Sequence, residues 1–242
     1  VFSMVTDDAA LAAITAGPDG ILSGLKAGEV YVDMSTVSPP ASRQLSEGVR
    51  ARGAEMLDAP VSGSIPQAES GTLAIMVGGE PQAFAVVEPL LRELGETVTH
   101  VGSNGQGLVL KLAINISLAV QTLAFSEGLL LAERAGIDPA LAAEVMGNSS
   151  IGSPMLKARI PLLLELPERA WFDVELMHKD IRLALETAND LHIPLPSATV
   201  VDDVLTMAEE LGYAHRDLAA LHEVLANMAQ PGDSPAAPRG PM

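Results

Sequence analysis

Short apolar runs alternate with helical patterns through the first hundred residues of the chain. Glycine, proline and other turn residues bound the apolar runs, which predicts β-strands. Strands that alternate with helices are typical of βαβ units in a mainly parallel sheet. We expect strands at residues 1–5, 29–34, 55–59, 72–77 and 97–101, and helices at 8–25 (broken at 17–20), 39–52 and 81–94.

Helical periodicity replaces this alternation after Gly102. Residues 108–134 contain neither proline nor a strand-like break, so they predict one long helix. We therefore predict an α/β fold in which a sheet domain at residues 1–104 precedes an all-helical domain at 105–230. Further helices are expected at 139–146, 154–166, 174–191, 198–211 and 216–228.

The last twelve residues contain four prolines and two glycines. Such a segment buries too little apolar surface to offset the entropy that ordering costs. We expect a disordered tail at 231–242.

The charge of the chain excludes several classes of partner. Its 31 acidic and 14 basic residues give a formal net charge of −17. A nucleic-acid binder needs a basic face, and so does a protein that docks on anionic membranes, so we expect neither partner. There is no cysteine, which removes disulfides and thiolate chemistry. A reducing compartment fits this composition, and we expect a cytoplasmic protein.

One lysine interrupts a helix that is otherwise apolar on nearly all sides. Lys111 is the only charged residue in the stretch 108–125, and burying an unpaired ammonium is costly. It therefore pairs, loses its proton or faces a cleft, and Asn115 lies one turn further along the same face. A general acid/base site is one interpretation. A lysine whose amine extends to the surface is the other. Polar side chains interrupt the apolar run, which disfavours a membrane span.

Two of the predicted strands end in small polar residues. In open α/β sheets, ligands bind beyond the carboxyl ends of the strands. Ser62 and the backbone N–H groups around Gly63 could hold a carboxylate there, although an ordinary strand-to-loop exit explains the same residues. The Ser and Thr residues at 35–38 would by default cap the helix that follows.

Other polar positions predict structure rather than chemistry when each is taken alone. Lys179 and Asp180 are adjacent in a predicted helix and suggest a solvated charged pair. Gly102, Gly105 and Gly107 lack the context of a dinucleotide fingerprint and suggest a hinge. The five histidines show no metal-ligand spacing, so we expect no metal site.

Together and in this order, several segments resemble the β-hydroxyacid dehydrogenase family, the relatives of 3-hydroxyisobutyrate dehydrogenase and tartronate semialdehyde reductase. The resemblance runs from residue 1 to about residue 228. It is carried by Asp33-Met34-Ser35-Thr36, by Asp58-Ala59-Pro60-Val61-Ser62-Gly63, by the glycine-framed stretch 71–79, by Gly105-Gln106-Gly107 with Lys111 and Asn115, and by Lys179-Asp180.

The resemblance implies a partial Rossmann-type parallel sheet followed by an all-helical C-terminal domain. It also implies hydride transfer between NAD or NADP and a small 3-hydroxy acid or its semialdehyde, in a homodimer or homotetramer. Lys111 matches the family's catalytic lysine, and Asn115 would orient the substrate hydroxyl. Ser62 and Gly63 would bind the substrate carboxylate. The cofactor would contact Met4, Val5, Thr6, Thr36 and Lys179.

The chain departs from the family pattern in two places. Ser64 stands where the family often has a second glycine, which leaves the substrate open. The family's G-x-G-x-x-G unit, which holds the pyrophosphate and precedes the position that separates NAD from NADP, is missing. We therefore expect a chain truncated at its N-terminus that binds NAD(P) weakly. The alternative function is a non-catalytic helical dimerisation module, or an inactive fragment that keeps the family fold.

Overall fold

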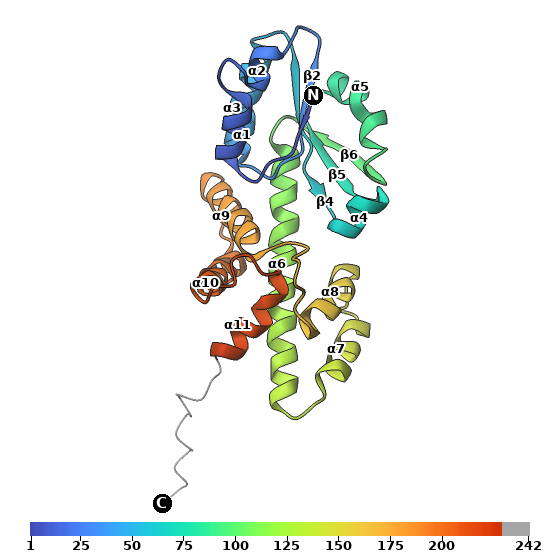
Figure 1. The fold of residues 1–242 in the computed structure, drawn as a ribbon, viewed down its shortest axis with the longest axis vertical. Helices are drawn as coiled ribbons and strands as arrows, with labels where there is room; N and C mark the ends of the chain where they lie inside the picture. The colour runs from blue at the N-terminus through green and yellow to red at the C-terminus, as the bar shows by residue number, and fades with distance from the viewer. Residues whose placement is uncertain (229–242) are drawn as a thin grey trace, which may run out of the picture.

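The computed structural model describes residues 1–228. Figure 1 shows a sheet with flanking helices at one end of the molecule and a group of helices at the other. The tail expected to be disordered, at 231–242, lies outside the described residues. The strands are β1 (Phe2–Ser3), β2 (Val30–Asp33), β3 (Glu55–Asp58), β4 (Val61–Ser62), β5 (Ala74–Gly78) and β6 (Thr97–Gly102).

These strands form one mixed sheet in which parallel pairs predominate. The order is β1-β2-β3-β5-β4, and β6 pairs with β5. Parallel pairing joins β1 to β2, β2 to β3 and β5 to β6. This confirms the predicted α/β class. β5 runs antiparallel to β3 and to β4, a two-residue strand that the sequence pattern did not predict.

Alternate residues of the central strands face opposite sides of the sheet. Tyr31 pairs with Met56, and Val32 with Leu57. The first pair packs in one hydrophobic cluster and the second pair in another, as a period of two requires. Figure 1 shows helices on both sides of the sheet. These are α1 (Asp8–Thr15), α2 (Ile21–Gly24) and α3 (Pro39–Arg50) on one side, with α5 (Pro81–Leu91) on the other, and the short α4 (Ile65–Ser70) after β4.

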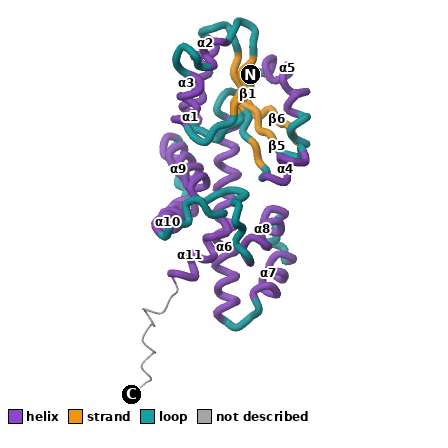
Figure 2. The backbone as a smooth tube through the Cα atoms, viewed as in Figure 1, coloured by secondary structure: helices purple, strands orange, loops and turns teal. Residues whose placement is uncertain are grey.

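A 29-residue helix, α6 (Gln106–Arg134), joins the sheet to the helical half. At 1.5 Å per residue it is about 44 Å long. Helix α6 packs against β5 near its N-terminal end, and α7, α8, α9, α10 and α11 pack against the rest of it. Figure 2 shows strands only in the N-terminal half of the molecule. The other helices are α7 (Pro139–Asn148), α8 (Pro154–Leu164), α9 (Val174–Asp190), α10 (Pro196–Glu210), the 3₁₀ turn η1 (Leu218–Ala220) and α11 (Leu221–Met228).

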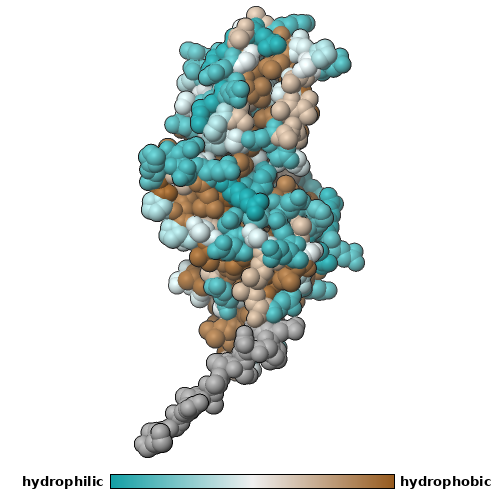
Figure 3. Space-filling view, turned by 90° about the vertical axis from the view of Figure 1, so that its left-hand side faces the viewer, coloured by the Kyte–Doolittle hydropathy of each residue, from teal (hydrophilic) through white to brown (hydrophobic). Residues whose placement is uncertain are grey.

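Helix α6 is long and apolar enough to cross a membrane by length and composition alone. Its contacts identify it as a core helix instead, because α9, α11 and β5 all pack against it. The surface of the helical half carries both polar and hydrophobic side chains, as Figure 3 shows.

Asp58, at the end of β3, fixes the start of α6. Its Oδ1 accepts the backbone N–H of Gly105 at 2.7 Å, and its Oδ2 accepts that of Leu108 at 3.1 Å. These N–H groups belong to the first turn, which has no partners within the helix. A Cβ on Gly107 would lie 2.5 Å from the carbonyl oxygen of Met76. Gly107 therefore allows close packing at an anchored helix start, and the hinge expected at these glycines stays a prediction.

Candidate active site

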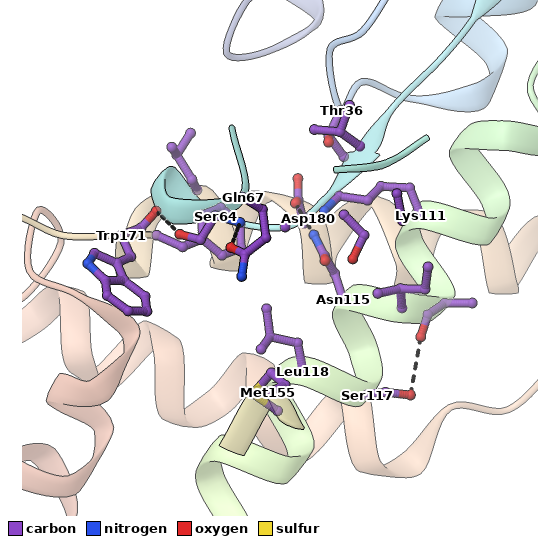
Figure 4. Close-up of a pocket in the computed structure, with 18 of the residues that line it drawn as sticks. Thr36, Ser64, Gln67, Lys111, Asn115, Ser117, Leu118, Met155, Trp171 and Asp180 are labelled. Atoms are coloured by element: carbon purple, nitrogen blue, oxygen red, sulfur yellow. Dashed lines mark hydrogen bonds between the residues drawn. The ribbon is translucent and has the colours of Figure 1, made fainter. Parts of the chain in front are cut away.

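A cavity of about 930 Å³ lies where the ends of β2 and β4 meet α6, α8 and α9. Segments far apart in the sequence contribute to its wall, and Figure 4 shows side chains from several of them pointing into it. The structure thus brings every predicted site residue to one place. They are Met4, Val5, Thr6, Thr36, Ser62, Gly63, Lys111, Asn115 and Lys179.

The charge of this cavity is opposite to that of the chain. Its wall holds three basic residues, Lys111, Arg159 and Lys179, and one acidic residue, Asp180. The whole chain has a formal net charge of −17. Lys179 pairs with Asp180, and Arg159 pairs with Asp217, each at 3.0 Å, so Lys111 is the basic residue of the wall without an ion pair among residues 1–228. An unpaired cation at a cavity wall suits an anionic ligand.

Asp180 is at the centre of a hydrogen-bonded cluster near Lys111. Asn115 Nδ2 donates to Asp180 Oδ2 at 2.6 Å. Lys179 Nζ lies 3.0 Å from Asp180 Oδ1, although that oxygen accepts no well-directed hydrogen bond. The same ammonium donates to the carbonyl oxygen of Thr36. Asp180 is buried, so the expectation of a solvated Lys179–Asp180 pair is wrong, because α6 covers the carboxylate.

Lys111 reaches the cavity from the second turn of α6, and no other residue among 1–228 forms a hydrogen bond or ion pair with its amine. Figure 4 places it beside Asp180 and Asn115. Burial lowers the pKa of Lys111; Asp180 opposes that shift and Lys179 adds to it. Burial also raises the pKa of Asp180, against the effect of the neighbouring Lys179 and Lys111. The amine is thus free for a ligand, and its proton is easier to remove than that of an exposed lysine.

The turn from β4 into α4 forms another part of the wall. Gly63 has a φ of 134°, and a Cβ there would lie 2.7 Å from Leu73 Cδ2, so the turn requires glycine. Ser64 N donates to Gln67 Oε1 at 2.9 Å, which completes a capping box for α4. Ser64 Oγ donates to the carbonyl oxygen of Trp171 at 3.2 Å. The serine that departs from the family pattern therefore links this turn to the loop before α9.

Sequence reasoning missed three residues of this region. Arg159 lines the cavity, and Asp217 is buried behind it. Arg159 Nη1 donates to Asp217 Oδ1 at 3.0 Å. Trp171 lines the cavity next to them. No comparable signal was visible in the sequence, because Arg159 is one of three charged residues in 154–166, whereas Lys111 is the only one in 108–125.

Two family models match consecutive parts of the chain. Residues 1–102 match the NAD binding domain of 6-phosphogluconate dehydrogenase. Residues 105–225 match the NAD-binding domain of NADP-dependent 3-hydroxyisobutyrate dehydrogenase. The fold, the cavity and these matches define an NAD(P)-dependent oxidoreductase, with NAD or NADP as its cofactor.

Individual relatives narrow this class to a family. The chain is 34% identical over 229 residues to 2-hydroxy-3-oxopropionate reductase of Escherichia coli, covering 95% of this chain and 78% of that protein. It is 32% identical over 229 residues to 2-(hydroxymethyl)glutarate dehydrogenase of Eubacterium barkeri, covering 94% and 76%. A crystal structure of 3-hydroxyisobutyrate dehydrogenase from Salmonella typhimurium superposes with a TM-score of 0.84 at 27% identity, covering 92% and 78%. The chain therefore belongs to the β-hydroxyacid dehydrogenase family, as its motifs predicted.

Proposed function

We propose that this protein transfers a hydride reversibly between NAD(P) and a small 3-hydroxy acid or its semialdehyde or oxo acid, with Lys111 as the acid/base group. The observation that carries the proposal is the environment of that amine. It is half-buried and without a protein partner within residues 1–228, in a cavity whose wall holds three basic residues and one acidic residue. Such a group suits proton exchange with an anionic substrate.

One end of the cavity fits the cofactor. Met4 and Val5 offer apolar surface, as a flat nicotinamide ring requires, and Thr6 and Thr36 lie beside them. Lys179 brings a positive charge that suits ribose hydroxyls or phosphate, and its bond to the Thr36 carbonyl holds it at this end. NAD(P), when bound there, supplies or accepts the hydride.

The protein's own residues position the substrate and move the proton. In the reduction direction Lys111 donates a proton to the substrate oxygen, and it takes the proton back in the oxidation direction. Asn115 would orient that oxygen; its bond to Asp180 fixes its side chain. Ser62 Oγ and the backbone at Gly63 would bind the substrate carboxylate, since glycine allows an anion to approach the backbone.

The proposed substrate is a small carboxylate, in keeping with the names of the relatives. The E. coli relative is a reductase of 2-hydroxy-3-oxopropionate, and another, from Arabidopsis thaliana, is named for glyoxylate and succinic semialdehyde. We also propose a homodimer or homotetramer in the cytoplasm, which fits a chain without cysteine.

Turnover of a substrate panel by the Lys111→Ala variant tests the proposal. NADH and NADPH consumption is measured with glyoxylate, succinic semialdehyde and 2-hydroxy-3-oxopropionate. Loss of a general acid/base costs a factor of about 10²–10⁴, so we expect kcat to fall by that much while cofactor affinity stays nearly constant. Lys111→Arg should restore little, because guanidinium hardly deprotonates.

Lys157 provides the matched control, because it is an exposed lysine outside the cavity. Lys157→Ala should keep the kcat of the unsubstituted protein. The proposal fails if Lys111→Ala keeps more than about half of that kcat. An absence of turnover with every substrate and both cofactors would favour the alternative function, which is a non-catalytic dimerisation module or an inactive fragment that keeps the family fold.

A further inference from the structure

Arg159 is a nearly enclosed guanidinium on the wall of the cavity. Its residue exposure is 5%, and its only hydrogen bond within residues 1–228 runs from Nη1 to Asp217. A guanidinium carries five N–H donors, so most of them have no acceptor in the described part of the chain. Its remaining nitrogens are not fully sealed from solvent, so their free edge can reach the cavity.

The Asp217 carboxylate accepts hydrogen bonds from other groups besides Arg159, so it neutralises the guanidinium only in part. It accepts the backbone N–H groups of Trp171 at 2.8 Å, Phe172 at 3.3 Å and Ala219 at 3.0 Å. Three backbone donors therefore stabilise the same negative charge. Leaving buried donors of a charged group unpaired is costly, so the open edge of the guanidinium suits a further anionic acceptor.

Arg159 lies at the end of the cavity away from Lys111. Figure 4 shows Trp171 and Lys111 on opposite sides, with Ser64 and Gln67 between them. Asp217 bonds both to the backbone of Trp171 and to Arg159, which places Arg159 at the Trp171 end.

Apolar side chains also line the cavity, beside the polar Ser64 and Gln67. They suit a short methylene chain, because they offer no partner to a polar group. These side chains are Leu118, Met155, Phe172 and Leu176.

We propose that Arg159 binds a second carboxylate of the substrate, and hence that the protein acts on dicarboxylic hydroxy acids or semialdehydes. The acid group remote from the reacting carbon would bind at Arg159, and the first carboxylate near Ser62. This proposal rests on the proposed function, because that function sets where the reacting carbon of the substrate lies. The arginine itself supplies the specificity, since a guanidinium binds a carboxylate through two parallel N–H bonds.

Binding of two matched probes tests this site without any turnover. Glutarate and pentanoate have the same number of carbons and differ by one carboxylate. Calorimetric titration should show that the protein binds glutarate roughly tenfold to a hundredfold more tightly, the usual worth of a hydrogen-bonded charge. Lys111 and Lys179 also attract anions in this cavity, so the preference is assigned to Arg159 only through the variants described next.

Arg159→Gln should bring the two affinities to within about threefold, mainly by weakening glutarate. A protein that binds both probes equally, or an Arg159→Gln variant that keeps the preference, would overturn the proposal. If Arg159→Gln fails to fold because Asp217 loses its partner, the variant that combines Arg159→Met with Asp217→Asn removes both charges and must show the same loss of preference.

Lys111→Ala separates this test from that of the proposed function. It should retain the glutarate preference, because the amine lies at the other end of the cavity. A glutarate preference in a protein without turnover would leave the Arg159 site standing and overturn only the proposed hydride transfer.

Discussion

Desolvation shifts the pKa values of Lys111 and Asp180 in opposite directions. Desolvation disfavours the charged form of each group, so it lowers the pKa of the lysine and raises that of the aspartate. Their mutual attraction works against both shifts. Asp180 is thus a positioning residue: it holds Asn115 by a hydrogen bond and keeps the Lys111 amine more readily protonated than burial alone would.

The pH dependence of reduction should reveal this coupling. Lys111 must be protonated to donate, so kcat/KM for reduction should fall as pH rises through its pKa, below the ordinary lysine value of about 10.4. Asp180→Asn removes a charge that raises this pKa, so the inflection should move to lower pH. Asp190→Asn, at the exposed end of the same helix, should leave the inflection in place. An inflection that stays put or moves to higher pH in Asp180→Asn would contradict the coupling.

Sequence could identify Lys111 but not the residues that complete its surroundings. A single charge in an apolar helix is visible in one window of sequence. Asn115 and Asp180 are 65 residues apart, and Arg159 and Asp217 are 58 apart. No local sequence pattern identifies partners so far apart. Asp180 taken alone therefore predicted a solvated residue, and Arg159 was not predicted as a site residue. Their environment depends on how α6, α8 and α9 pack.

Among the helices and strands, α6 has the largest effect on the site, because its first turns set the position of Lys111. Asp58 accepts three donors there: the N–H groups of Gly105 and Leu108, and Asn104 Nδ2. Lys111 follows within the next turn, so its position depends on this anchor.

Asp58→Ala should therefore destabilise the protein as well as the site. Removing the carboxylate leaves buried N–H groups unpaired at about 1–3 kcal/mol, which we expect to see as a lower free energy of unfolding in urea. The slope m should not change, since the exposed surface is similar. Asp19→Ala, in an exposed turn, should stay within about 0.5 kcal/mol of the unsubstituted protein. Equal stabilities for the two variants would show that the anchor is unimportant.

Regular elements were predictable because each spans several periods of its pattern. All five predicted strands form, and the long helix begins within two residues of its predicted start at 108. The strand β4 and the helix α4 escaped notice because they have two and six residues, too few to show a period. Turn chemistry predicted the helix start at Ser38 and Pro39, where the serine caps α3.

The whole molecule combines an acidic surface with a cationic cavity. Surface charges act over about 8 Å at physiological ionic strength, so a carboxylate inside the cavity interacts mostly with the lysines and the arginine of the wall. The acidic exterior limits non-specific binding to nucleic acid.

The helical half also exposes apolar side chains that a monomer would leave in water. Leu131 is 73% exposed near the end of α6, and Val145 is 62% exposed on α7. Ile137 and Leu141 are exposed between them, and Leu141 and Val145 are one helical turn apart, on the same face. Exposed apolar patches of this kind mark association surfaces, which agrees with the proposed homo-oligomer.

Light scattering should accordingly give a mass at least twice the 25.1 kDa of one chain. Joint substitution of Leu141→Glu and Val145→Glu places two carboxylates in the association surface, and burying them is costly, so the mass should fall. Val86 and Leu90 supply the control: they are exposed on α5 with the same spacing, and their joint replacement by glutamate should leave the mass unchanged. A protein that runs as a monomer at micromolar concentration, or an α7 variant that keeps the larger mass, would show that this corner of the helical half is not an interface.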